Sequence, residues 1–221
     1  MSPTTLSRLS GLALTCGSAL FAIGNLLHPI DHSPTSQASP TWEAAHVTMV
    51  LALMLMALGL PGVYARQAVR AGNLGLAGLV LLFVGMIAII PGLWHEAFVV
   101  PAIGPEAARA VEQGTGGRWH VIADTVFLVG HVAFGLATFR ARVFPRAVAN
   151  LLLVSAGVAS ASAVLVLAGG LSTPPSVVAI MAGAVLLSLG YAWLGCAQVA
   201  SLRGVEAPSA DRVLGAPLLG R

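Results

Sequence analysis

The sequence has no lysine and few charges of either sign, and this scarcity excludes most water-soluble folds. Of its 221 residues, 9% are charged and 57% are apolar, whereas soluble globular domains have roughly 25% and 45–50%. A chain with so little polar surface cannot cover a water-soluble core. The composition suits lipid, where the outer face of each helix is apolar too.

Clustered basic residues are also absent. The formal charge of +3 comes from arginines placed singly or in small groups at the ends of apolar runs, so the basic balance does not indicate nucleic-acid binding. Cysteine is scarce as well. Cys16 and Cys196 both fall inside apolar runs at different expected depths, and we therefore expect no disulfide between them.

Long apolar runs are what the sequence does have, and they predict an all-α fold. Each has about the 20 residues that a helix needs to cross a bilayer. The runs cover residues 6–28, 43–65, 73–98, 119–140, 146–169 and 175–201. We predict one polytopic membrane helix bundle of about six transmembrane helices over residues 1–203. Residues 204–221 are polar enough to predict a disordered cytoplasmic tail.

Arginine placement predicts the orientation. With the N-terminus inside, the cytoplasmic segments hold nine arginines, and the opposite side holds only Arg109 and Arg118. Short cytoplasmic loops are enriched in basic residues, so we expect both termini in the cytoplasm and the protein in the cell (plasma) membrane. Three tryptophans are expected at the outer headgroup level, where indole rings are enriched: Trp42, Trp94 and Trp119.

Histidine is distributed unevenly, because none of the six lies in a predicted cytoplasmic segment. Four of them stand at the outer ends of separate predicted spans: His28, His46, His95 and His120. These spans therefore present imidazoles at nearly one depth. His32 lies in a loop rich in serine and proline, where we expect a solvated surface residue. His131 lies three turns deeper than His120 on the fourth span.

Carboxylates accompany these histidines. Glu43 precedes His46 by three residues, Glu96 follows His95 directly, and Asp124 lies four residues after His120. At 100° per residue, His120, Asp124 and His131 share a stripe about 40° wide. A stripe of ionisable groups is costly against lipid, so it should face the bundle interior or a water-filled cavity.

The pattern favours a metal or haem site at the outer face, in a membrane metalloenzyme or a redox protein whose partner is a small molecule or a metal ion. Imidazole is a common ligand of zinc, iron and copper, and carboxylates complete or orient such shells. The predicted metal ligands are His28, His46, His95, His120 and Asp124. The predicted catalytic carboxylates are Glu43, Glu96 and Asp124. For haem b, the candidate ligands are His46, His120 and His131.

Two other functions remain open. The stripe of His120, Asp124 and His131 is also typical of a proton relay in a proton-coupled carrier of small solutes. A structural or lipid-binding membrane subunit would explain the apolar bulk and leave the outer histidines without a role.

Two segments carry a resemblance. The runs Gly24-Asn25-Leu26-Leu27-His28-Pro29 and Pro91-Gly92-Leu93-Trp94-His95-Glu96 resemble segments of small multi-pass bacterial membrane proteins of unassigned function. The resemblance extends over most of the chain and includes no catalytic motif. It supports the multi-pass topology alone.

Overall fold

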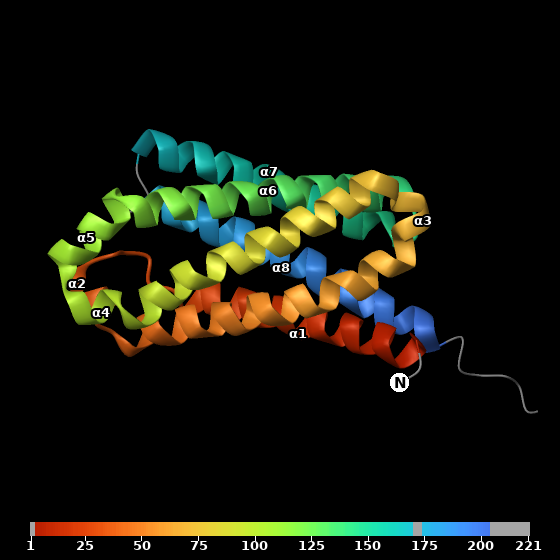
Figure 1. The fold of residues 1–221 in the computed structure, drawn as a ribbon, viewed down its shortest axis with the longest axis horizontal. Helices are drawn as coiled ribbons and strands as arrows, with labels where there is room; N and C mark the ends of the chain where they lie inside the picture. Colours follow the sequence, from red (N-terminus) through yellow and green to blue (C-terminus); the bar gives the residue numbers. More distant parts are fainter. Residues whose placement is uncertain (1–2, 170–173, 204–221) are drawn as a thin grey trace, which may run out of the picture.

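The computed structural model describes residues 3–169 and 174–203, and within them every secondary-structure element is a helix (Figure 1). The helices are α1 (Pro3–Leu27), α2 (Pro34–Gln37), α3 (Pro40–Phe98), α4 (Val100–Ile103), α5 (Pro105–Gln113), α6 (Thr115–Ala141), α7 (Arg146–Gly169) and α8 (Pro174–Arg203). The predicted all-α bundle is confirmed. The predicted tail, residues 204–221, lies outside the described residues.

Five of the described helices are long and apolar enough to cross a membrane: α1, α3, α6, α7 and α8. The six predicted spans fall within these five because α3, with 59 residues, contains two of them. As a straight rod, α3 would extend about 90 Å at 1.5 Å per residue, about three times the hydrocarbon thickness of a bilayer.

Gly72 resolves this excess of length. Its backbone leaves the helical region with φ 57° and ψ −154°, and α3 reverses direction there (Figure 1). Glycine adopts a positive φ without the steric cost that a Cβ atom imposes. The first leg, residues 40–71, and the second leg, residues 73–98, correspond to the predicted spans 43–65 and 73–98. The connection between those spans is helical up to the bend, which hydropathy alone did not predict.

Close backbone approach fixes how the two legs pack. A Cβ atom on Gly59 of the first leg would lie 2.6 Å from the backbone nitrogen of Leu14 in α1. On the second leg, a Cβ atom on Gly78 would lie 2.5 Å from the backbone nitrogen of Phe134 in α6. Small residues permit such close helix contacts in membranes. The first leg therefore packs on α1 and the second leg on α6.

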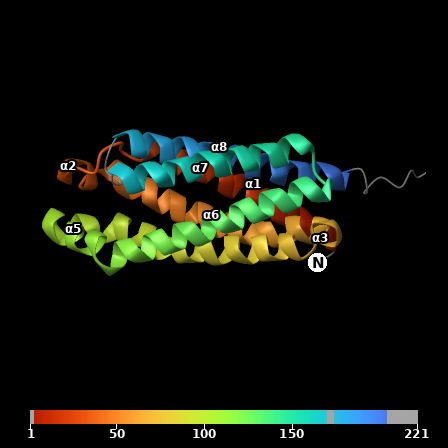
Figure 2. The same ribbon diagram turned by 90° about the horizontal axis from the view of Figure 1, so that it is seen from above.

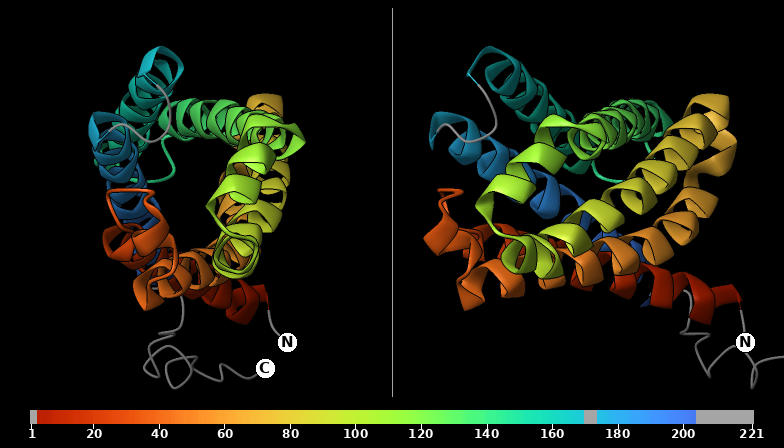
Figure 3. Two further views of the ribbon diagram at one scale, coloured as in Figure 1. Left: turned by 90° about the vertical axis from the view of Figure 1, so that its left-hand side faces the viewer. Right: turned by 60° about the vertical axis from the view of Figure 1, so that its left-hand side comes forward.

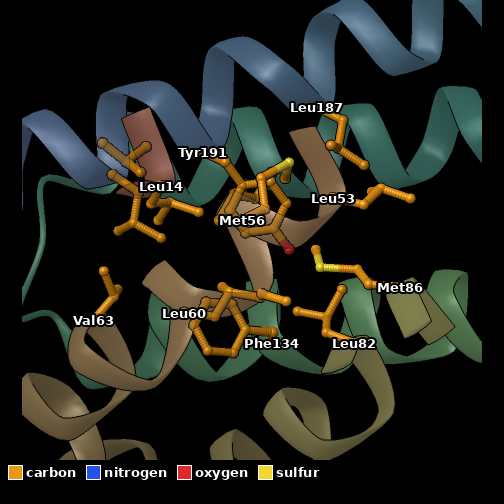
Figure 4. Packing of buried hydrophobic residues seen from close by; sticks show 14 of the residues in the cluster. Leu14, Leu53, Met56, Leu60, Val63, Leu82, Met86, Phe134, Leu187 and Tyr191 are labelled. Atoms are coloured by element: carbon orange, nitrogen blue, oxygen red, sulfur yellow. The ribbon is translucent and has the colours of Figure 1, made fainter. Parts of the chain in front are cut away.

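The hydrophobic core lies where these legs meet α8. Leu14, Met56, Leu82, Phe134 and Tyr191 are each fully buried and come from α1, both legs of α3, α6 and α8 (Figure 4). The helices α7 and α8 pack side by side along the bundle (Figure 2). The core thus joins the helices into one bundle.

Helix ends gather at two ends of the bundle (Figure 1), and the left panel of Figure 3 looks along the bundle from one of them. The histidine end holds the end of α1, both termini of α3, the short helices α2, α4 and α5, and the start of α6. The arginine end holds the start of α1, the Gly72 bend, the connection from α6 to α7 and the end of α8. The arginines in or near these segments are Arg8, Arg66, Arg70, Arg140, Arg142 and Arg146. Which end faces the cytoplasm stays a prediction from this arginine distribution.

Candidate functional site

A hydrogen-bonded turn shapes the loop that follows α1 at the histidine end. The Asp31 carboxylate accepts hydrogen bonds from the Ser33 backbone N–H at 3.3 Å, from the Ser33 hydroxyl at 3.0 Å and from the Ser36 hydroxyl. Short polar side chains that bond nearby backbone are typical of turns. The bonds from Ser36 and Ser33 keep the pKa of Asp31 below its ordinary value. The turn brings His32 back toward α1.

Serine also fixes where α3 begins. The Ser39 hydroxyl accepts the backbone N–H of Trp42 at 3.3 Å, and Pro40 occupies the first turn. An N-cap followed by proline is a strong helix start. The cap places Trp42 inside the bundle, where it is fully buried, and its indole N–H donates to the Glu96 carbonyl at 2.7 Å. This bond ties the first leg of α3 to the end of the second.

The imidazoles of His28, His32 and His46 gather around Trp42, and we call these four residues the histidine cluster. The ring centres of His28 and His46 are 4.9 Å apart, and those of His28 and His32 are 5.5 Å apart. Trp42 lies 4.6 Å from His46 and 5.1 Å from each of the other two imidazoles. The cluster thus joins the end of α1, the following loop and the start of α3.

Hydrogen bonds orient two of these rings in the same way. His28 Nδ1 lies 2.7 Å from its acceptor, the Pro29 carbonyl, and His46 Nδ1 lies 2.7 Å from the Trp42 carbonyl. Because a carbonyl oxygen only accepts, each Nδ1 carries the proton. In the neutral ring, the lone pair is then on Nε2. Both histidines therefore offer an acceptor nitrogen.

The surroundings of His28 and His32 favour the neutral form of both imidazoles. Burial lowers the pKa of His28, and the nearby charge of His32 lowers it further, against the opposing bond to the Pro29 carbonyl. Burial likewise lowers the pKa of His32, although the Asp31 carboxylate opposes the shift. Burial disfavours the charged form of an imidazole, so both rings are poised as acceptors near neutral pH.

The set of histidines that lie close together differs from the predicted set. His28 and His46 come together as expected, but His32, predicted to be solvated surface, is half-buried against His28 and Trp42. His120 is close enough to His46 for their charges to interact, and its ring packs on Gly92. His95 is half-buried and makes none of the ring contacts of the cluster.

The predicted set of five metal ligands does not assemble as a single centre. Within residues 3–169 and 174–203, no three side chains among histidine, cysteine, aspartate and glutamate are placed to hold a metal ion. The physical reason is helix rotation, because spans that end at one depth still point their imidazoles in different directions. An Asp-x-Ser turn after His28 was the signal in the sequence that His32 folds back.

The predicted catalytic carboxylates are also dispersed. Glu43 is exposed on the first turn of α3. Glu96 adjoins the cluster through its carbonyl, and its Oε2 atom is buried. Asp124 is exposed and close enough to His120 for an electrostatic interaction. Of the three tryptophans expected at the headgroup level, Trp42 is fully buried within the bundle, whereas Trp94 and Trp119 are half exposed.

His131 lies in a separate polar node in the core, formed with Ser155 of α7 and Tyr191 of α8. Ser155 Oγ donates to the Leu152 carbonyl at 2.8 Å, so it accepts from His131 Nε2 at 2.9 Å. Tyr191 then donates its hydroxyl proton to His131 Nδ1, also at 2.9 Å. Both ring nitrogens are occupied, and within the described helices no hydrogen bond joins His131 to Asp124. Haem ligation by His131 would break one of these bonds.

The fold and this composition define the class: the chain is an integral membrane protein of the polytopic α-helical type. No family model, no curated protein and no solved structure matches it. The histidine cluster therefore has to be interpreted from its own chemistry.

Proposed function

We propose that the histidine cluster binds a transition-metal ion, with His28 and His46 as its first two ligands. One observation carries the proposal: the Nδ1 atoms of these two rings are held by backbone carbonyls, and the ring centres are 4.9 Å apart. Ligand histidines are characteristically oriented in this way through the nitrogen that does not bind the metal. The arrangement leaves an Nε2 lone pair on each of two neighbouring rings, one directly after α1 and one in α3.

His32 supplies the third ligand in this proposal. Its ring centre lies 5.5 Å from that of His28, and it is carried by a loop rather than by a helix. Because the three rings do not converge as they are placed, a side-chain rotation of His32 accompanies binding. Three imidazoles with one open position are typical of catalytic metal sites. Glu96, whose carbonyl accepts the Trp42 indole N–H, is then a candidate for a general base.

An isolated ion fits this cluster better than haem between the same two rings. A metal–nitrogen bond is about 2 Å long, so two axial imidazoles on one iron place their ring centres about 6 Å apart, with the porphyrin between them. His28 and His46 are closer than that and lie at an interplanar angle of 65°. Imidazole ligands suit zinc, copper and iron alike, so the proposal names the ligand set and leaves the metal to measurement.

Metal binding by purified protein tests the proposal. The protein is stripped with a chelator in detergent, incubated with Zn²⁺, Cu²⁺ or Fe²⁺, desalted and analysed by elemental mass spectrometry. We expect about one ion of a preferred metal per chain. His28→Ala and His46→Ala should each weaken binding by roughly tenfold or more, and His32→Ala should weaken it less.

His95→Ala is the matched control, because His95 is a half-buried histidine at the same end but outside the cluster. It should bind metal as the wild type does. A wild-type protein that retains none of the three metals contradicts the proposal, and so does a His46→Ala variant with unchanged affinity. Thermal unfolding of each variant in the same detergent separates loss of ligands from loss of fold.

A further inference from the structure

A groove at the arginine end lies on the far side of the bundle from the histidine cluster. The first leg of α3, the connection from α6 to α7, and α8 line it, and its volume is about 440 Å³. Arg66 provides its polar wall, and Phe144, Pro145, Trp193 and Ala197 contribute apolar surface. A single cation beside apolar walls is the combination that an amphiphile with an anionic headgroup requires.

Arg66 is oriented by contacts with the protein that use only part of its hydrogen-bond donors. Its Nη1 donates to the Ala197 carbonyl at 3.3 Å and to Gln198 Oε1 at 3.5 Å. The guanidinium carbon lies 4.8 Å from the centre of the Phe144 ring. These contacts orient the guanidinium and leave Nη2 and Nε without an acceptor among the described residues. Such a fork matches two oxygens of a phosphate group.

The charge around Arg66 is not balanced by the described protein. The acids of the described residues are Asp31, Glu43, Glu96, Glu106, Glu112 and Asp124, and none of them lies at the arginine end. Arg70 lies one helical turn beyond Arg66, and Arg142 and Arg146 flank the lining residues Val143–Pro145. A basic groove between membrane helices attracts anionic lipid headgroups.

The apolar wall of the groove extends from Arg66 along α8. Because α8 runs toward the arginine end, Trp193 lies about 6 Å further into the bundle than Ala197, at 1.5 Å per residue. Trp193 is 46% exposed, and Cys196 is exposed within the groove. The apolar wall thus continues from Arg66 toward the bilayer interior.

We propose that this groove binds one anionic phospholipid, with its phosphate on Arg66 and an acyl chain along Trp193. Native mass spectrometry with dioleoyl-phosphatidylglycerol and dioleoyl-phosphatidylcholine tests this. Wild-type protein should retain one phosphatidylglycerol with at least fivefold preference over phosphatidylcholine. Arg66→Gln should abolish the preference, Arg66→Lys should keep part of it, and Arg118→Gln, at the histidine end, should keep all of it.

Cys196 gives a second measurement that reports on the groove itself. In a Cys16→Ala background, phosphatidylglycerol should slow the reaction of Cys196 with a maleimide severalfold, and Arg66→Gln should remove this protection. Equal retention of the two lipids, or a lipid preference unchanged in Arg66→Gln, overturns the proposal. A chain truncated after residue 203 gives a further test. If Cys196 reacts faster in it and lipid gives no protection, residues 204–221 are the occupant and the proposal is overturned.

Discussion

His28, His46 and His131 are three imidazoles in one bundle, but the structure treats them in two ways. His131 is fully buried in the core, and both of its ring nitrogens are hydrogen-bonded, to Ser155 and Tyr191. His28 and His46 each donate a hydrogen bond from one ring nitrogen to a backbone carbonyl. The comparison shows that burial alone does not mark a functional histidine. The hydrogen-bonding state of the second ring nitrogen distinguishes a packing residue from a candidate ligand.

The largest expected effect comes from removing the core imidazole. His131→Ala should lower the free energy of unfolding by about 3 kcal/mol, because it leaves a cavity and deprives two buried hydroxyls of a partner. Unfolding in detergent, followed by circular dichroism against SDS concentration, measures this loss. Metal binding should be unchanged. A folded variant with altered metal affinity would remove the distinction between the two regions.

A smaller loss should follow when only one hydrogen bond of the polar node is removed. Tyr191→Phe should cost about 1 kcal/mol, since the ring packing remains and one bond to His131 disappears. Tyr64→Phe is the matched control, because the Tyr64 hydroxyl makes no hydrogen bond to the described residues. It should stay within roughly 0.5 kcal/mol of the wild type. Equal effects of the two substitutions would contradict the assigned role of Tyr191.

Acid should destabilise the histidine cluster. The folded pKa values of His28 and His32 lie below the ordinary value of 6.5 because both rings are partly buried. The unfolded chain therefore binds more protons, and stability should fall as the pH drops through about 6.5. Unfolding in detergent between pH 7.5 and 5 measures the fall. A variant carrying both His28→Gln and His32→Gln should show a flatter profile, whereas His95→Gln should keep the wild-type slope.

The smallest expected effect concerns the border of the cluster. In Gly92→Ala, the added Cβ atom would lie 2.4 Å from the His120 ring, so the imidazole has to move. The stability change should stay within about 1 kcal/mol, because a side chain rather than backbone gives way. Metal affinity should equal that of the wild type, since the proposed ligands do not include His120. A lost affinity would extend the site to α6.

Part of the site was predictable from local sequence. The depth of each histidine follows from its distance along a helix, and this placed His28 and His46 correctly at one end. The contact of His32 was not predicted, because it depends on the turn held by Asp31. The hydrogen-bond partners of His131 were not predicted either. Ser155 and Tyr191 lie on two other helices, and the sequence near His131 does not show how those helices are rotated.

The amino-acid sequence by itself determined that this chain is a set of apolar helices suited to a bilayer. That information is local, since hydropathy and helix length are properties of each run. Only the tertiary structure decided which polar side chains meet. One residue of displacement turns a helix face by 100°, so contacts between helices depend on rotations set by close approaches such as Gly59 on Leu14 and Gly78 on Phe134.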